Sequence, residues 1–139
     1  MAVFTKKLKI ASKAETQILD ISDAVNECIT ASGLSDGIVS VHAYRSTCAI
    51  GTVEYEPGLI KDLHELFEKL LPRKAYYHHE ETWHDGNGFS HVRSSLFGTS
   101  QSFNLIGGEL YVYPWQQIIL LDFAPQGDKK EISVVIVGE

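Results

Sequence analysis

The sequence has few cysteines, and they are not arranged as a pair. Cys28 and Cys48 do not form a C-x-x-C motif, which excludes the short thiol motifs of redox and metal sites. Cys28 falls in a helical pattern and Cys48 in an apolar run, where a free cysteine packs as a small hydrophobic side chain. We therefore expect two buried, reduced thiols.

Long apolar runs are also missing. No stretch approaches the roughly 20 apolar residues that cross a bilayer, and no charged-then-apolar leader opens the sequence. We therefore expect no membrane partner and a cytoplasmic location.

Basic side chains are in the minority. The sequence has 12 Lys and Arg residues against 18 Asp and Glu, giving a formal charge of −6. Nucleic-acid binding requires a basic patch, and Lys6-Lys7 alone indicates the solvated face of a first strand. We therefore expect no nucleic-acid partner.

The remaining composition is that of an ordinary globular protein. Its 139 residues are 44% hydrophobic and 22% charged, which suits a single domain over residues 1–139.

Three segments have helical periodicity. Gly33 and Gly98 follow two of them where helices commonly end, and Ser22 offers a side chain suited to an N-cap. The segments are Ser22–Ser32, the residues from Pro57 to just before Pro72, and His91–Phe97.

Alternating or β-rich runs fill most of the other positions, with turn signals between them. Gly107-Gly108 predicts a hairpin and Pro125–Asp128 a turn. The pattern predicts an α+β domain with a mixed or mostly antiparallel sheet and two to three helices. The expected strands are Val3–Ile10, Glu15–Ile21, Gly37–Tyr44, Cys48–Tyr55, Ser102–Ile106, Leu110–Tyr113, Gln117–Phe123 and Ile132–Val137.

The segment from Tyr76 to Gly98 carries most of the candidate chemistry. It reads YYHHEETWHDGNGFSHVRSSLFG and holds four of the six histidines together with three carboxylates. Imidazoles and carboxylates on a glycine-hinged loop suit divalent metal binding or proton transfer near neutral pH.

The chain contains DIS at 20–22, SG at 32–33, EYEPGLxxDL at 54–63, ETWHDGNGxSHVR at 81–93, and WQQI at 115–118 followed by DF at 122–123. These runs resemble one known family over about Lys7 to Glu139, namely the YjbQ family. The resemblance implies a compact α+β fold that assembles as a homotrimer, and a pocket of histidine, acidic and amide groups that holds a metal in some relatives. It also implies a weak thiamin-phosphate synthase activity.

The sequence departs from the family pattern in the strand before Glu54. Relatives usually have His-Thr-Thr there, whereas this chain has Arg45-Ser46-Thr47. A guanidinium is permanently charged and can neither bind a metal nor transfer a proton. Its planar fork suits an anionic oxygen instead.

Each retained candidate has a functional and a structural interpretation. With the resemblance, His78 and His91 are candidate ligands for Zn, Ni, Mn or Fe. The alternative is a pair of hydrogen-bonded loop histidines, because their spacing matches no compact zinc motif.

The acidic candidates also have both a functional and a structural interpretation. Glu54 and Glu56 share one face of a strand and repel each other unless a cation, a proton or an arginine such as Arg45 lies between them. The alternative is a solvated strand end. Asp62 either points into the pocket or complements the N-terminus of its helix.

Three further residues are candidate ligand contacts beside Arg45, namely Thr47, Asn87 and Ser94. Asn87 lies between two glycines and also suits a purely structural turn. Ser94 has no neighbouring base at a recognisable spacing, so we do not expect a nucleophilic triad.

Two classes of function follow. In the first, an enzyme acts on a small anionic, phosphorylated metabolite: His78 and His91 hold a metal or the phosphate, and Glu54, Asp62 or His91 transfers a proton. In the second, the chain is a non-catalytic ligand-binding or structural oligomer. Both rest on the expectation that the histidine-rich segment folds over the Glu54 strand end to form one cleft.

Overall fold

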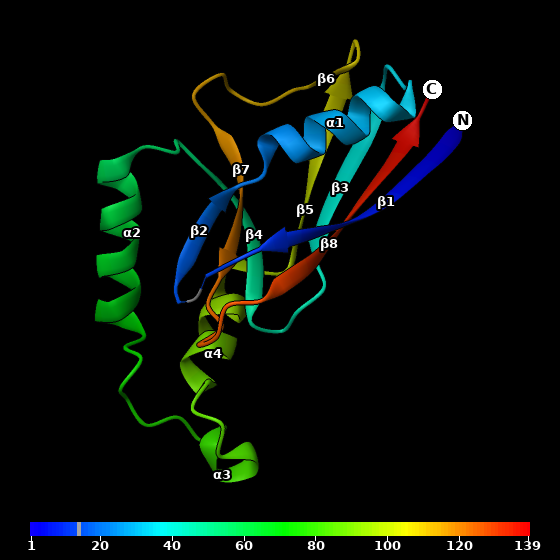
Figure 1. Ribbon diagram of the computed structural model, residues 1–139. Coiled ribbons are helices and arrows are strands. Elements are labelled where there is room, and N and C mark those ends of the chain that lie inside the picture. The colour runs from blue at the N-terminus through cyan, green and yellow to red at the C-terminus, as the bar shows by residue number, and fades with distance from the viewer. Residues whose placement is uncertain (14) are drawn as a thin grey trace.

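The computed structural model describes residues 1–13 and 15–139 and has the predicted α+β architecture (Figure 1). The strands form two antiparallel sheets. One sheet has the order β1 (Ala2–Ala11), β8 (Lys129–Gly138), β3 (Gly37–Ala43), β5 (Ser100–Ile106) and β6 (Glu109–Leu110). The other has the order β2 (Gln17–Asp20), β7 (Gln117–Asp122) and β4 (Cys48–Val53).

The helices match the predicted segments, with one addition. They are α1 (Ser22–Ser32), α2 (Pro57–Leu70), α3 (Glu80–Trp83) and α4 (Gly88–Phe97). The four residues of α3 were not predicted, and α4 begins three residues earlier than expected.

The predicted ends of α1 are confirmed, but the predicted N-cap is wrong. Gly33 ends the helix in a left-handed conformation with φ 67°. Ser22 lies inside the helix, after the N-cap residue Ile21. Its hydroxyl accepts a hydrogen bond from the backbone N–H of Ile118 in β7, at 2.9 Å, and so ties α1 to the central strand of the smaller sheet.

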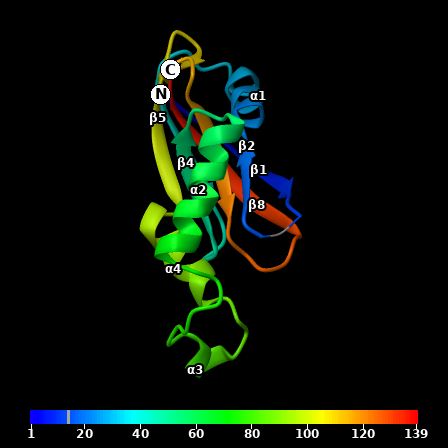
Figure 2. The ribbon, with the colours of Figure 1, turned by 90° about the vertical axis from the view of Figure 1, so that its left-hand side faces the viewer.

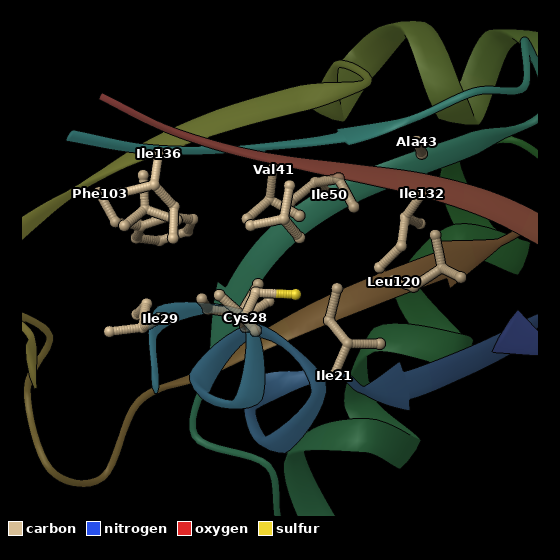
Figure 3. Packing of buried hydrophobic residues seen from close by; sticks show 14 of the residues in the cluster. Ile21, Cys28, Ile29, Val41, Ala43, Ile50, Phe103, Leu120, Ile132 and Ile136 are labelled. Carbon is tan, nitrogen blue, oxygen red and sulfur yellow. The ribbon is translucent and has the colours of Figure 1, made fainter. Parts of the chain in front are cut away.

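The core lies on both faces of β7. Ile118 and Leu120 pack toward the larger sheet and α1, whereas Ile119 and Leu121 pack toward α2 and Phe123. This alternation follows from the two-residue period of a strand, and the burial of both faces explains the continuous apolar run in the sequence. Figure 3 shows the first of these clusters, with Cys28 among its members.

The two cysteines are free and buried, as predicted. Across residues 1–13 and 15–139, no helix combines the length and the apolar character needed to cross a membrane.

Three connections meet at one end of the sheets. They are the corner between β3 and β4, the loop between β7 and β8, and the segment that carries α3 and α4. Both ribbon views place α3 beyond the end of the sheets, away from the N-terminal end of α2 (Figures 1 and 2).

Candidate functional site

A pocket of about 620 Å³ lies where the three connections meet. Each connection contributes one group of residues to its wall, and the groups are far apart in the sequence. The lining residues are Arg45, Ser46 and Thr47; His79, Trp83, Asp85, Asn87 and His91; and Ala124, Pro125, Gln126 and Asp128.

Glu80 shapes the histidine-rich wall. Its carboxylate accepts hydrogen bonds from the backbone N–H groups of Gly86 at 2.6 Å and Gly88 at 2.8 Å. A negative charge at this position also complements the N-terminus of α4. Gly88 is required by space, because a Cβ there would lie 2.5 Å from the Cβ of Tyr77. The glycines therefore let the segment close on itself, as the sequence indicated.

Two imidazoles meet inside this closed segment. The ring centroids of His79 and His91 lie 4.4 Å apart with the planes inclined by 48°. When the side-chain amide of Asn87 is oriented with its nitrogen toward these acceptors, the nitrogen donates to Asp85 Oδ1 at 2.7 Å and to His79 Nε2 at 3.1 Å. Asn87 and Asp85 therefore fix the orientation of the His79 ring beside His91.

The surroundings of His91 favour the neutral form of its imidazole. Burial lowers the pKa of His91 below 6.5, and the neighbouring His79 lowers it further, against the opposing influence of Asp85 and the Ser46 backbone. A neutral imidazole at neutral pH is able to accept a proton from a bound group.

Arg45 supplies a cation on the wall formed by the β3–β4 corner. Its guanidinium contacts Asp128 Oδ2 at 2.8 Å, and its side chain is 43% exposed. Thr47 beside it is buried, and its backbone carbonyl accepts a hydrogen bond from Phe123 N–H. This bond joins the β3–β4 corner to the end of β7 and holds two of the pocket walls together.

Four of the residues proposed from the sequence therefore line one pocket: Arg45, Thr47, Asn87 and His91. Ser94 does not. Its buried hydroxyl donates to the backbone carbonyl of Cys48 and fastens α4 to β4.

His78 also lies outside the pocket. Its side chain is 90% exposed, and Nδ1 contacts Glu81 at 2.8 Å. This is the arrangement of a hydrogen-bonded loop histidine. His79, which was not among the proposed ligands, lines the pocket instead.

We expected the histidine-rich segment and the Glu54 strand end to form one cleft. Within a single chain this prediction is wrong, because Glu54 does not line the pocket. β4 leaves the pocket near Cys48 and ends at Val53, so Glu54 lies roughly 20 Å away at about 3.3 Å per residue. Glu56 is engaged elsewhere, because its carboxylate caps α2 by accepting from the N–H groups of Gly58 and Leu59.

Two further predictions about acidic residues are also wrong. Asp62 is an exposed residue of α2 and does not line the pocket. Arg45 pairs with Asp128 rather than lying between Glu54 and Glu56.

Asp128 lines the pocket although the sequence did not suggest it, and Asp85 lines it without having been assigned a role of its own. Asp85 was visible in the histidine-rich segment, next to the Gly-Asn-Gly break. Asp128 had no local signal, because its partner Arg45 lies 83 residues earlier in the chain.

The pocket side chains do not fit a three-ligand metal centre. Within the described part of the chain, no group of three His, Cys, Asp or Glu side chains is placed to hold one metal ion. The paired imidazoles contact each other, His78 is remote, and a permanent cation shares the pocket. Protein metal sites of that kind need convergent donors, so we derive no step through a metal.

The family model described as "UPF0047 protein YjbQ-like" matches residues 6–139. A UPF0047 protein of Methanothermobacter thermautotrophicus is 31% identical over 135 residues, covering 96% of this chain and 93% of that protein. A UPF0047 protein of Archaeoglobus fulgidus is 35% identical over 116 residues, covering 84% and 86%. The crystal structure of a YbjQ-like protein of unknown function from Sulfolobus solfataricus is similar with a TM-score of 0.93, at 26% identity and 99% coverage of both chains.

Proposed function

The chain belongs to the UPF0047 YjbQ-like family, and from this premise we propose that it binds a small anionic, phosphorylated metabolite in the pocket between Arg45 and His91. The observation that carries the proposal is the presence of a permanent cation and a neutral imidazole in the same pocket. The first suits an anionic oxygen and the second suits proton transfer.

Each pocket residue has a different role in the proposed binding site. Arg45 offers parallel N–H donors to two oxygens of a phosphate or carboxylate. Thr47 and Asn87 add hydrogen-bonding groups on either side. His91 accepts a proton from a ligand hydroxyl or amine, a role that the sequence had assigned as readily to Glu54 or Asp62. Asn87 and Asp85 orient His79, which in turn supports the neutral form of His91.

A second function uses the same pocket without turnover. The pairing of Arg45 with Asp128 supports it, because an engaged arginine at the position of a family histidine is suited to holding a ligand rather than transferring its protons. The two functions differ in their dependence on His91: an enzyme loses turnover in His91→Gln, whereas a binding protein shows none in the parent either.

We also propose a homotrimer, as the family resemblance implies. Exposed apolar side chains support the proposal, since Leu70, Val92 and Leu96 line a groove of about 470 Å³ between α2 and α4. Assembly would also give the Glu54 strand end of one subunit a route to the pocket of another. Light scattering at several concentrations tests the subunit number, and a monomer throughout contradicts it.

A thermal-shift experiment tests the anion site. Phosphate is expected to raise the melting temperature of the parent but not that of Arg45→Ala, because ligand binding stabilises the folded state that holds the site. Arg73→Ala is the matched control, since Arg73 is equally exposed and paired with Glu15 away from the pocket. Equal shifts in the parent and Arg45→Ala contradict the proposal.

The synthase activity that the family resemblance implies stays a prediction. If the pocket performs it, rescue of a thiamin-requiring host depends on Arg45 and His91. Rescue by a variant that lacks both side chains would mean that the growth effect is indirect.

A further inference from the structure

A row of alternating charges runs from the pocket wall into the protein. Arg45 contacts Asp128, and Asp128 in turn contacts Lys130. Lys130 then contacts Asp122 Oδ2 at 3.2 Å. Exposure falls along the row, from 48% for the side chain of Asp128 to 1% for Lys130 and 0% for Asp122.

The inner end of this row is fixed. The Asp122 carboxylate accepts hydrogen bonds from the Ser12 hydroxyl and from the backbone N–H of Ala124, the latter at 3.0 Å. Together with Lys130 these donors satisfy a charge that is fully buried. A buried ion pair with its remaining hydrogen bonds made is costly to separate, so Lys130 cannot leave to accommodate a ligand.

Asp128 lies between a buried cation, Lys130, and a half-exposed one, Arg45. Its Oδ1 is held by Lys130 and its Oδ2 by Arg45. Hydrogen bonds from Lys130 and then from Arg45 hold the pKa of Asp128 below its usual value, so the carboxylate is charged at neutral pH. If Arg45 turns to another partner, Asp128 still keeps Lys130.

This arrangement bears on the anion site of the proposed function. The guanidinium that would bind a ligand already has a carboxylate partner, and that partner lines the same pocket. An anion that enters the pocket meets the charge of Asp128 at the side chain it needs. Like charges a few ångströms apart repel, and in a half-exposed site the repulsion is only partly screened.

We propose that Asp128 is the specificity-determining residue of the pocket: its carboxylate competes with the ligand anion for Arg45, which changes partner when the ligand binds. The inference rests on the proposed anion site. Asp128 therefore weakens anion binding in the parent, and a ligand succeeds only if its own contacts replace the Arg45–Asp128 contact.

Asp128 also has an effect that favours anion binding. The Arg45–Asp128 contact also orients the guanidinium, and its loss would weaken binding by lost orientation. Ion pairs between half-exposed side chains are worth little. Removal of a competing charge in direct contact has the larger effect, and we expect about a tenfold gain in affinity when it is removed.

Calorimetric titration with inorganic phosphate at constant ionic strength tests this inference. Asp128→Asn keeps the shape of the side chain and removes its charge, and is expected to lower the phosphate Kd about tenfold. Asp128→Ser is the second charge-free variant, because serine is readily accepted in a surface turn. Melting curves of both variants verify that they are folded.

Two controls isolate the competition. Glu131→Gln removes one negative charge from β8, where Glu131 pairs with Lys9 and does not line the pocket, and is expected to change the Kd by less than about twofold. The double variant Arg45→Ala/Asp128→Asn is expected to bind phosphate no more tightly than Arg45→Ala, because the guanidinium for which the carboxylate and the anion compete is absent.

Each other result overturns the inference. Equal phosphate affinity in the parent and Asp128→Asn excludes competition while leaving the proposed anion site intact. Weaker binding by Asp128→Asn makes Asp128 a positioning residue for Arg45. An equal gain in Glu131→Gln means that the net charge of the protein sets the affinity. Phosphate binding that persists in Arg45→Ala, or that none of the proteins shows, overturns the proposed function and the inference with it.

Discussion

The imidazole rings of His79 and His91 lie with their centroids 4.4 Å apart, although His79 precedes α3 and His91 belongs to α4. Two rings in contact resist double protonation, because the second charge would be placed beside the first. Glu80 makes this contact available by clamping the segment that separates the two histidines. The pair therefore connects the shape of the loop to its acid–base chemistry.

The first prediction concerns the titration of His91. Its pKa is lowered below 6.5, mainly by burial and next by His79, so its ring signals in NMR spectra are expected to titrate below those of an exposed histidine. Replacement of His79 in His79→Gln removes one cause and is expected to raise the pKa of His91. A His91 pKa at or above 6.5 in the parent contradicts this account.

Stability should follow the same titration. Between the lowered folded pKa and the unfolded value of about 6.5, the unfolded chain binds more protons at His91 than the folded chain does. The free energy of unfolding therefore rises with pH through this window and falls on acidification. His91→Gln is expected to show a flatter dependence between pH 5 and 7 in urea unfolding, and an unchanged slope would argue against it.

The second prediction concerns thiol reactivity. Burial, and then the adjacent Asp122 carboxylate, raises the pKa of Cys48 to about 12. Because the thiolate is the reactive form, Cys48 is expected to resist iodoacetamide in the folded protein at pH 8 and to react fully in denaturant. Mass spectrometry of the peptide that contains Cys48 measures both rates, and rapid labelling of the native protein contradicts the buried site.

The third prediction concerns Arg93, which fastens the C-terminal end of α2 to α4. Its guanidinium is 4% exposed and donates to the Leu71 carbonyl at 3.0 and 2.8 Å and to Thr16 Oγ1 at 2.9 Å. Arg93→Ala leaves the partly buried Leu71 carbonyl without its donors and is expected to cost about 2–4 kcal/mol in the free energy of unfolding.

Arg73→Ala is the matched control for this experiment. Arg73 is 45% exposed and pairs with Glu15, so its loss is expected to cost less than about 1 kcal/mol. Chemical denaturation of both variants decides between the two roles. Equal losses would mean that burial of Arg93 contributes no additional stability.

These contacts also mark which parts of the fold could be predicted from the sequence. The end of α1 was predicted correctly because its signal, Gly33, lies within the segment itself. The start of α4 was not, since the carboxylate that accepts its first N–H comes from Glu80, eight residues earlier. The strand expected at Leu110–Tyr113 is shorter, because β6 pairs with β5 alone and only over two residues.

The same distinction between local and long-range contacts applies to the site. Arg45, Thr47, Asn87 and His91 could be proposed from residue type and family resemblance. The partnership of Arg45 with Asp128 depends on sheet register: Ala43, the last residue of β3, pairs with Ile132 in the antiparallel strand β8, which brings the residues that follow β3 alongside the start of β8. β4 runs antiparallel to β7 and carries Glu54 away from the pocket. This direction also depends on strand pairing and could not be predicted from the local sequence.

The fourth prediction concerns metal. Protein purified without an affinity tag is expected to contain well below one equivalent of Zn, Ni, Mn or Fe, because the described residues offer no three convergent donors. Elemental analysis by mass spectrometry measures the content. A stoichiometric metal that disappears in His91→Ala would show that the pocket rearranges to bind it.

The position of a bound anion tests the central claim most directly. In a crystal soaked with tungstate, an electron-dense analogue of phosphate, the account predicts an anomalous peak within hydrogen-bonding distance of the Arg45 guanidinium and in the same pocket as His91. It also predicts that the peak is absent from Arg45→Ala. A peak at another surface in the parent, or an unchanged peak in the variant, would contradict the account.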